Sequence, residues 1–278
     1  MHLSEIWIYP VKSLSGIRLS QSQVEEKGLQ YDRRWLIVDE KGTFLTQRVN
    51  AQMALLDVIL ANDGLLISHR YQPEKQLLIP FKRETNEEIT VKIWNDYVKA
   101  RTVSQLADEW LSDHLGKAVR IVEMTPETQR KLDPTYAHND SNVSFADDFP
   151  FLLISQASLA DLNERLSQPV GMQRFRPNFV ISGTEPYAED QWHFITIGNI
   201  RFEVAKSCER CIVVNIDNHT GMKGSDPLKT LASYRKVGRN IFFGQNVIGM
   251  GSGIIRQGDE VTLLTTRKEV PEEIRNLQ

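Results

Sequence analysis

The sequence predicts a mostly β protein of the α+β class, built from two β-barrel-like parts that pack together and carry a few helices. Short apolar runs recur along the chain, and Gly, Asn, Asp or Pro separates them, which is typical of strands joined by turns. Only a few stretches repeat apolar residues at helical spacing. The 278 residues are enough for one large or two modest domains.

Residues 1–102 are expected to form the first part, a small antiparallel barrel or sandwich. Its predicted strands are EIWIYPV, RWLIVDE, GTFLTQR, ALLDVILAND, GLLISHR, KQLLIP and EEITVKIWNDYVKA. Each is short and bounded by turn residues, as strands of a small β domain are.

Residues 103–278 are expected to form the second part. It begins with a helix at SQLADEWLSDHLG, for which Ser104 is the expected N-cap and Gly116 the expected stop. AVRIVEM then predicts a strand. Residues 124–148 are polar and rich in turn residues, so we expect a long surface loop, and such loops are often functional.

A buried strand is predicted at FPFLLI, followed by a helix at SQASLADLNERLSQP with Ser155 as its N-cap. FRPNFVISG predicts the next strand. Gly198-Asn199 separates HFITI from IRFEVAK, and this pair of residues favours a two-residue β-hairpin.

The rest of the chain is expected to alternate between strands and short helices. CIVVNID predicts a strand, and DPLKTLASYRKV a short helix with Pro in its first turn. NVIGM, SGIIR and EVTLLTT are predicted as the last strands, and PEEIRNLQ as a terminal helix.

Composition excludes several classes of function. The net charge of −3 gives no general attraction to nucleic acid, and no nucleic-acid-binding motif stands out. No apolar run reaches the roughly 18 residues that span a bilayer, and the first residues do not resemble a signal peptide. Two cysteines do not make a disulfide framework. We therefore expect a cytoplasmic protein with reduced thiols and no membrane partner.

The stretch KSCERC contains both cysteines, Cys208 and Cys211, and four interpretations are open. A redox disulfide is disfavoured, because the motif does not open a helix after a strand. Structural zinc is disfavoured, because it needs about four ligands and the six histidines are scattered. Both thiols could be inert strand-end residues, although Lys206 and Arg210 flank them and cations lower the pKa of a thiol.

The fourth interpretation is a single thiolate that binds a soft transition metal, with an organic cofactor completing the coordination. It requires an anion-binding pocket elsewhere in the chain. Candidate segments are Lys12-Ser13 in a turn, Arg33-Arg34 before a strand, and Arg176-Pro177-Asn178 before another strand. Each alone is weak, because an Arg before a strand is more often a solvated charge.

Taken together, the motifs resemble the MOSC-domain molybdenum enzymes: the mitochondrial amidoxime-reducing component and bacterial reductases of N-hydroxylated bases. The matching stretches are IWIYPVKSLSG, YDRRWLIVDEKGTFLTQR, FADDFPFLLISQASLADLNERL, FRPNFVISG, AEDQW, KSCERCIVVNIDNHTG, DPLKTLASYR and FFGQNVI. They run in the family's order over nearly the whole chain. The resemblance implies an N-terminal β-barrel-like domain over residues 1–102 and a MOSC β-barrel domain over residues 103–278.

The resemblance also implies a site for the molybdenum cofactor, a molybdenum-bearing pterin. Cys211 would be the thiolate ligand of the metal. The residues implied to contact the cofactor are Lys12, Ser13, Arg33, Asp147, Asp148, Arg176, Asn178, Glu209, Arg210 and Asn246. Bidentate Arg suits a phosphate, and a thiolate suits a metal that already has sulfur ligands. Cys208 is expected to have a structural or supporting role.

The implied activity is reduction of N-hydroxylated substrates, such as amidoximes, N-hydroxylated bases and hydroxylamines. The general acid is not singled out, although Asp147 and Asp148 are conceivable. No Cys follows Cys211, so we expect no iron–sulfur cluster of the kind that some bacterial relatives carry in a C-terminal domain. Electrons are therefore expected from a separate ferredoxin, flavodoxin or flavin reductase. Two alternatives remain: a molybdenum-cofactor or persulfide-sulfur carrier, related to the C-terminal part of cofactor sulfurases, and a non-catalytic binding module.

Overall fold

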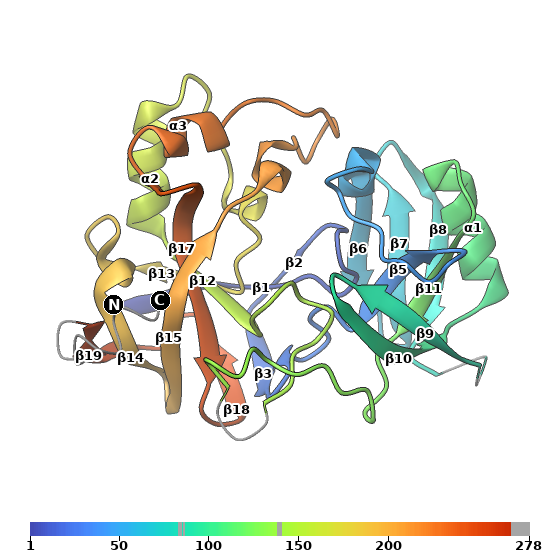
Figure 1. Ribbon diagram of the computed structural model, residues 1–278, viewed down its shortest axis with the longest axis horizontal. Helices are drawn as coiled ribbons and strands as arrows, with labels where there is room; N and C mark the ends of the chain where they lie inside the picture. The colour runs from blue at the N-terminus through green and yellow to red at the C-terminus, as the bar shows by residue number, and fades with distance from the viewer. Residues whose placement is uncertain (83–84, 86, 138–140, 268–278) are drawn as a thin grey trace.

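The computed structural model describes residues 1–82, 85, 87–137 and 141–267. Among the described residues, strand makes up 44% and helix 16%, which confirms the predicted mostly β class. Figure 1 shows two lobes, one built around a large sheet and one built around two smaller sheets with helix α1 on the outside.

The large sheet forms the core of one lobe and is mostly antiparallel, with a parallel pair at β12 and β13. Its strands are β1 (His2–Ile8), β2 (Ile17–Leu19), β12 (Phe151–Ser155), β13 (Phe179–Ser182), β14 (Trp192–Ile197), β15 (Ile200–Glu209), β16 (Lys236–Val237), β17 (Asn240–Gly249) and β19 (Val261–Thr266). The helices α2 (Gln156–Arg165) and α3 (Leu228–Ala232) pack beside it. Buried aromatic rings pack inside it: Phe151 stacks on Phe179, and Phe202 meets Phe179 edge-on.

The second lobe contains a four-stranded and a three-stranded sheet. Its elements are β5 (Trp35–Asp39), β6 (Leu56–Leu60), β7 (Gly64–His69), β8 (Gln72–Pro80), β9 (Glu88–Ile93), β10 (Asp96–Thr102), α1 (Gln105–Leu115) and β11 (Val119–Glu123). A small sheet of β3 (Gln21–Glu25), β4 (Gly28–Leu29) and β18 (Gly253–Arg256) lies below the large one. Short 3-10 helices are η1 (Ala51–Leu55), η2 (Met172–Arg174), η3 (Ala188–Gln191) and η4 (Ile212–Asn215).

Strand pairing does not follow the expected division between residues 102 and 103. β11 pairs with β5 and β10, so it belongs to the same sheet as the N-terminal strands. β1 pairs with β13, so the start of the chain belongs to the large sheet. Whether residues 1–102 and 103–278 are separate folding units stays a prediction.

The expected helix caps and the hairpin are confirmed. The Ser104 hydroxyl accepts a hydrogen bond from the Ala107 N–H, and Gly116 ends α1 with a φ of +66°. Ser155 caps α2 by accepting from the Ser158 N–H at 3.0 Å. Gly198, with a φ of +56°, and Asn199 connect β14 to β15. These features depend on neighbouring residues, so the local sequence is enough to predict them.

Other local expectations are wrong in whole or in part. The stretch GTFLTQR forms single bridges at Thr43 and Phe44 and no strand. CIVVNID forms the 3-10 helix η4 in place of a strand, and this turn buries Val214 while Ile212 is 45% exposed. The described residues of 124–148 form no helix or strand, as expected of a loop, but the loop is not confined to the surface, because Val143 and Phe145 are buried.

The predicted terminal helix at PEEIRNLQ lies outside the described residues. Among the residues described, no helix combines the length and apolar character needed to cross a lipid bilayer.

Candidate functional site

A cavity of about 400 Å³ opens between the two lobes. All the residues predicted to contact the cofactor or its metal line it, although their chemical roles stay predictions. They are Lys12, Ser13, Arg33, Asp147, Asp148, Arg176, Asn178, Glu209, Arg210, Cys211 and Asn246. Among the described residues that line the cavity, seven are cationic and three are acidic, so it suits an anionic ligand.

Backbone strain is concentrated at this cavity. Six described residues other than glycine have a positive φ, and four of them line the cavity: Ser13 (71°), Arg33 (50°), Trp94 (53°) and Arg176 (57°). This conformation is unfavourable for a residue with a Cβ and clusters at ligand-binding sites. The strain is an indication of function that does not depend on the sequence motifs.

Lys12 lines the cavity and is 6% exposed. Its Nζ donates to the Phe145 carbonyl at 2.8 Å and to Asp147 Oδ1 at 2.6 Å. The Trp94 indole N–H donates to the same carboxylate oxygen at 3.1 Å. Burial alone would raise the pKa of Asp147, but Lys12 and Trp94 hold that pKa well below its usual value. Burial lowers the pKa of Lys12, against the attraction of Asp147.

Two arginines surround the buried ring of Tyr9. The guanidinium carbons of Arg33 and Arg176 lie 4.3 and 4.2 Å from the ring centroid. Arg33 is held by Asp32, whose two carboxylate oxygens lie 2.8 and 2.7 Å from Nη1. Arg176 donates to the Leu14 carbonyl at 2.7 Å, and burial together with Arg33 lowers its pKa to about 10.

Asn178 borders the cavity, but its side-chain amide makes its hydrogen bonds to the backbone of neighbouring strands. Its Nδ2 donates to the Trp7 carbonyl at 3.1 Å, and its Oδ1 accepts from the Leu152 N–H at 3.1 Å. Arg33 Nη1 lies 3.4 Å from the same oxygen. Asn178 therefore joins β1, β12 and β13 and orients Arg33.

The two thiols line the same wall, at the end of β15 and the start of η4. The sequence suggested that flanking cations act on Cys211, but the Nη1 of Arg210 donates to Cys208 at 3.0 Å. Burial raises the pKa of Cys208, and Arg210 opposes that rise. The Nη2 of Arg210 donates to the Phe175 carbonyl at 2.5 Å, and its buried Nε lacks a partner among the described residues.

The other predicted residues occupy separate parts of the wall. The side chain of Ser13 borders the cavity, and its carbonyl accepts from Gln47 Nε2 at 2.7 Å. Asp148 and Glu209 are exposed. Asn246 lies on β17 opposite Leu152.

Sequence reasoning missed several residues of this site. Arg48 stacks over the Trp94 ring at 4.5 Å, and both line the cavity from the N-terminal lobe. Arg130, 5% exposed, donates to the Ser144 carbonyl at 3.0 Å and to the Asp147 carbonyl at 2.7 Å. Arg130 thus fixes the loop that carries Asp147, and only its place in a polar loop of the sequence could have drawn attention to it.

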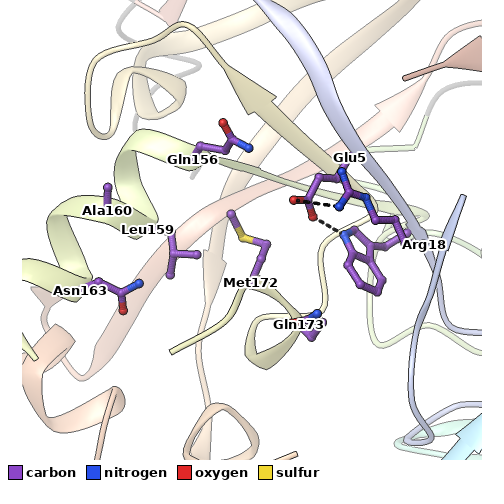
Figure 2. A pocket seen from close by; sticks show the side chains of 9 residues that line it. Glu5, Arg18, Gln156, Leu159, Ala160, Asn163, Met172 and Gln173 are labelled. Carbon is purple, nitrogen blue, oxygen red and sulfur yellow. Dashed lines mark hydrogen bonds and ion pairs between the residues drawn. The ribbon is translucent and has the colours of Figure 1, made fainter. Parts of the chain in front are cut away.

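A second cavity of about 390 Å³ lies outside the large sheet, between α2 and β1. Leu159 and Met172 form its apolar side, and Glu5 and Arg18 its polar side (Figure 2). The Trp7 indole N–H donates to Glu5 at 2.6 Å. None of the residues predicted for the site lines this cavity.

In the part of the chain that the structure describes, no three His, Cys, Asp or Glu side chains come together as a metal site would require. Cys211 is a candidate for a single protein ligand, beside a cavity rich in cations.

The chain matches two family descriptions and several known proteins. The MOSC N-terminal beta barrel domain matches residues 1–118, and the MOSC domain matches residues 140–262. The chain is 33% identical to human mitochondrial amidoxime-reducing component 1, over 94% of this chain and 82% of that protein. It is 34% identical to human mitochondrial amidoxime reducing component 2, over 84% and 72%.

A third relative is a molybdenum cofactor sulfurase from Arabidopsis thaliana, 33% identical over 87% of this chain and 32% of that protein. The chain therefore spans about a third of the sulfurase, but most of both human proteins. The chain belongs to the family of two-part MOSC-domain proteins that includes the mitochondrial amidoxime-reducing components.

Proposed function

We propose that the protein is a molybdenum-cofactor-dependent reductase of N-hydroxylated substrates. The observation that carries the proposal is the convergence of all the predicted residues on one strained, cationic cavity with a thiol in its wall. The names of the relatives support the same activity. Amidoximes, N-hydroxylated bases and hydroxylamines are the proposed substrate class.

The cavity fits an anionic pterin cofactor. Its excess of cations, drawn from both lobes, would compensate a phosphate and a dithiolene, and planar guanidinium groups can bind a phosphate with two parallel hydrogen bonds. The buried Nε of Arg210 is a donor without a partner among the described residues, as expected of a wall built to support a ligand. The volume of about 400 Å³ is in the range of small-molecule sites.

We assign the phosphate to Lys12, Ser13 and Arg33, and the metal to the Cys211 thiolate. Arg176, Glu209, Arg210 and Asn246 would line the pterin, with Asn178 acting through Arg33. When bound, the cofactor supplies the two-electron chemistry that converts R–NHOH, with two protons, into R–NH2 and water. The protein excludes water, orients the substrate and holds the proton donors.

Asp147 is poorly suited to donate a proton while Lys12 and Trp94 bind it, because they stabilise its ionised form. Asp148 is exposed and has no such cation–carboxylate contact described, so it is the better acid candidate of the pair. Electrons would come from a separate ferredoxin, flavodoxin or flavin reductase. A cytoplasmic location stays a prediction.

The deciding experiment is elemental analysis with pterin fluorescence on protein made in a molybdate-fed host. We expect about one molybdenum and one pterin per chain, with loss of the metal and of N-hydroxylamine reduction in Cys211→Ser. Cys208→Ser is the matched control and should retain molybdenum. Wild-type protein without molybdenum, from a host that loads a known molybdoenzyme, would refute the proposal.

The sulfurase relative favours one alternative, a molybdenum-cofactor or persulfide-sulfur carrier. It predicts a transferable persulfide on Cys211, or a loosely bound cofactor, without turnover. Mass spectrometry of the purified protein before and after thiol reduction separates the two functions, because the persulfide adds one reducible sulfur atom to the chain.

A further inference from the structure

A loop that follows the cysteines connects the two lobes. We call residues 217–224 the junction loop. It is bound to the N-terminal lobe by three hydrogen bonds: Arg70 to the Asn218 carbonyl, the Tyr71 hydroxyl to the His219 carbonyl at 2.6 Å, and Lys223 to the Arg48 carbonyl at 2.7 Å. In Figure 1 the orange chain before α3 reaches across to the lobe that contains η1.

The 3-10 helix η4 lies between Cys211 and the junction loop. The Cys211 carbonyl accepts from the Val214 N–H at 3.2 Å. Cys211 is therefore the N-cap residue of η4, and its backbone takes part in the first turn of this helix. A 3-10 helix leaves its last carbonyls without partners inside the helix. Something outside η4 must therefore hold its end.

Arg174, which lines the cavity, binds the end of η4. Its Nε donates to the Val214 carbonyl at 2.9 Å, and its Nη1 lies 3.1 Å from Asp217 Oδ2. Its Nη2 lies 3.5 Å from the Asp226 carbonyl. The side chain of Arg174 is only 11% exposed. Three donors of one planar group thus fix three points of the segment that follows Cys211.

The carboxylate of Asp217 connects Arg174 to the start of the junction loop. While Oδ2 contacts Arg174, Oδ1 accepts from the N–H groups of His219 and Thr220, both at 2.9 Å. The start of the junction loop is therefore built on the same carboxylate that Arg174 orients.

The residue next to Arg174 holds the other side of the cysteine. The Phe175 carbonyl accepts from Arg210, directly before Cys211. Phe175 is fully buried, and its ring centroid lies 4.5 Å from that of Phe243. Arg174 thus binds the segment after Cys211, and the Phe175 carbonyl binds the residue before it. The ring of Phe175 packs in the core of the lobe.

We propose that Arg174 is a positioning residue that fixes the Cys211 thiol in the cavity wall by holding η4 and the junction loop. The importance of this position for catalysis rests on the proposed function, in which Cys211 binds the metal. Lysine could not replace the arginine fully, because one ammonium group cannot reach all three acceptors in their fixed directions.

The test measures the reactivity of Cys211 without cofactor. In a Cys208→Ser background only Cys211 can react with iodoacetamide, since the chain has two cysteines. The limiting rate, taken where it no longer rises with pH, reports access to the thiol and not its protonation. For Arg174→Gln we expect this rate to rise about fivefold, the effect of losing one net hydrogen bond on local opening. Arg174→Lys should restore part of the protection.

Arg165→Gln is the matched control, because Arg165 also binds an aspartate, Asp161, but on the outside of α2. Its limiting rate should equal that of the parent. Asp217→Asn, which keeps the side-chain shape, is a milder second variant in case Arg174→Gln does not fold. A folded Arg174→Gln or Asp217→Asn protein that reacts at the parent rate would overturn the proposal, as would an equal acceleration in Arg165→Gln.

The outcome is independent of cofactor loading. If wild-type protein holds no molybdenum but Arg174→Gln exposes Cys211, the proposed function fails and the positioning role stands. If wild-type protein holds molybdenum and Arg174→Gln alkylates at the parent rate, the positioning role fails alone.

Discussion

Replacing Asp32 by Asn should destabilise the protein far more than the loss of an ordinary ion pair. Asp32 is fully buried, accepts from the Tyr9 N–H at 2.7 Å, and contacts Arg33 through both oxygens. Without its charge, Arg33 would face Arg176 across the same buried ring with no compensating anion. Removing one partner of a buried pair costs roughly 3–5 kcal/mol.

Urea unfolding of cofactor-free protein measures this loss. We expect Asp32→Asn to lose about 3 kcal/mol, at the lower end because Asn can still accept from Tyr9. Glu88→Gln is the control, since the Glu88 side chain is 48% exposed and pairs with Arg101 at 3.3 Å, so its replacement should cost less than about 1 kcal/mol. The double variant with Arg33→Gln should lose less than the sum of the single losses. A loss below about 1 kcal/mol for Asp32→Asn would refute the reasoning.

Two further predictions concern the framework. Gly244 has a φ of +80°, and an added Cβ would lie 2.9 Å from the Leu153 carbonyl oxygen. Gly244→Ala should therefore lower the free energy of unfolding, measured by urea titration, by about 2 kcal/mol. An unchanged free energy of unfolding would contradict this prediction. Burial raises the pKa of Asp108 from 3.8 to about 6, so the folded protein binds the proton more tightly and stability falls as pH rises through that window. Asp108→Asn should remove this fall, because an amide does not titrate, and its oxygen can still accept from the Ile121 N–H. Stability curves of the two proteins that remain parallel from pH 4 to 7 would contradict this prediction.

Features set by neighbouring residues were predictable from the sequence. The caps at Ser104 and Ser155 and the turn at Gly198 each depend on a few adjacent residues, and all three are confirmed. η4 was not predictable, because an apolar run does not show whether it will extend or turn. The pairing of β1 with β13 joins residues far apart in sequence, which periodicity alone does not show.

Part of the cavity lining was predictable from motifs, but Arg48, Trp94 and Arg174 were not, and neither were the internal connections. Arg130, Arg174 and Asp32 have no signature as single residues, since a charged residue is usually exposed. Their importance follows from burial and from the carbonyl or carboxylate groups they contact. Asn178 is a different case: its amide joins strands, which the sequence does not show, and its predicted contact with the cofactor stays a prediction.

The position of the cavity links ligand binding to the contact between the lobes. Lys12 and Arg48 approach it from one side, and Arg176 and Arg210 from the other, so an anion between them would reduce repulsion across the junction. A ligand that binds only the folded protein stabilises it by mass action. The junction loop follows Cys211 and η4, and its Lys223 donates to the Arg48 carbonyl in the other lobe. This contact would keep the thiol close to the cationic residues of that lobe. An anionic ligand and the junction loop thus favour the same arrangement of the two lobes, and loss of either should loosen the contact of the other.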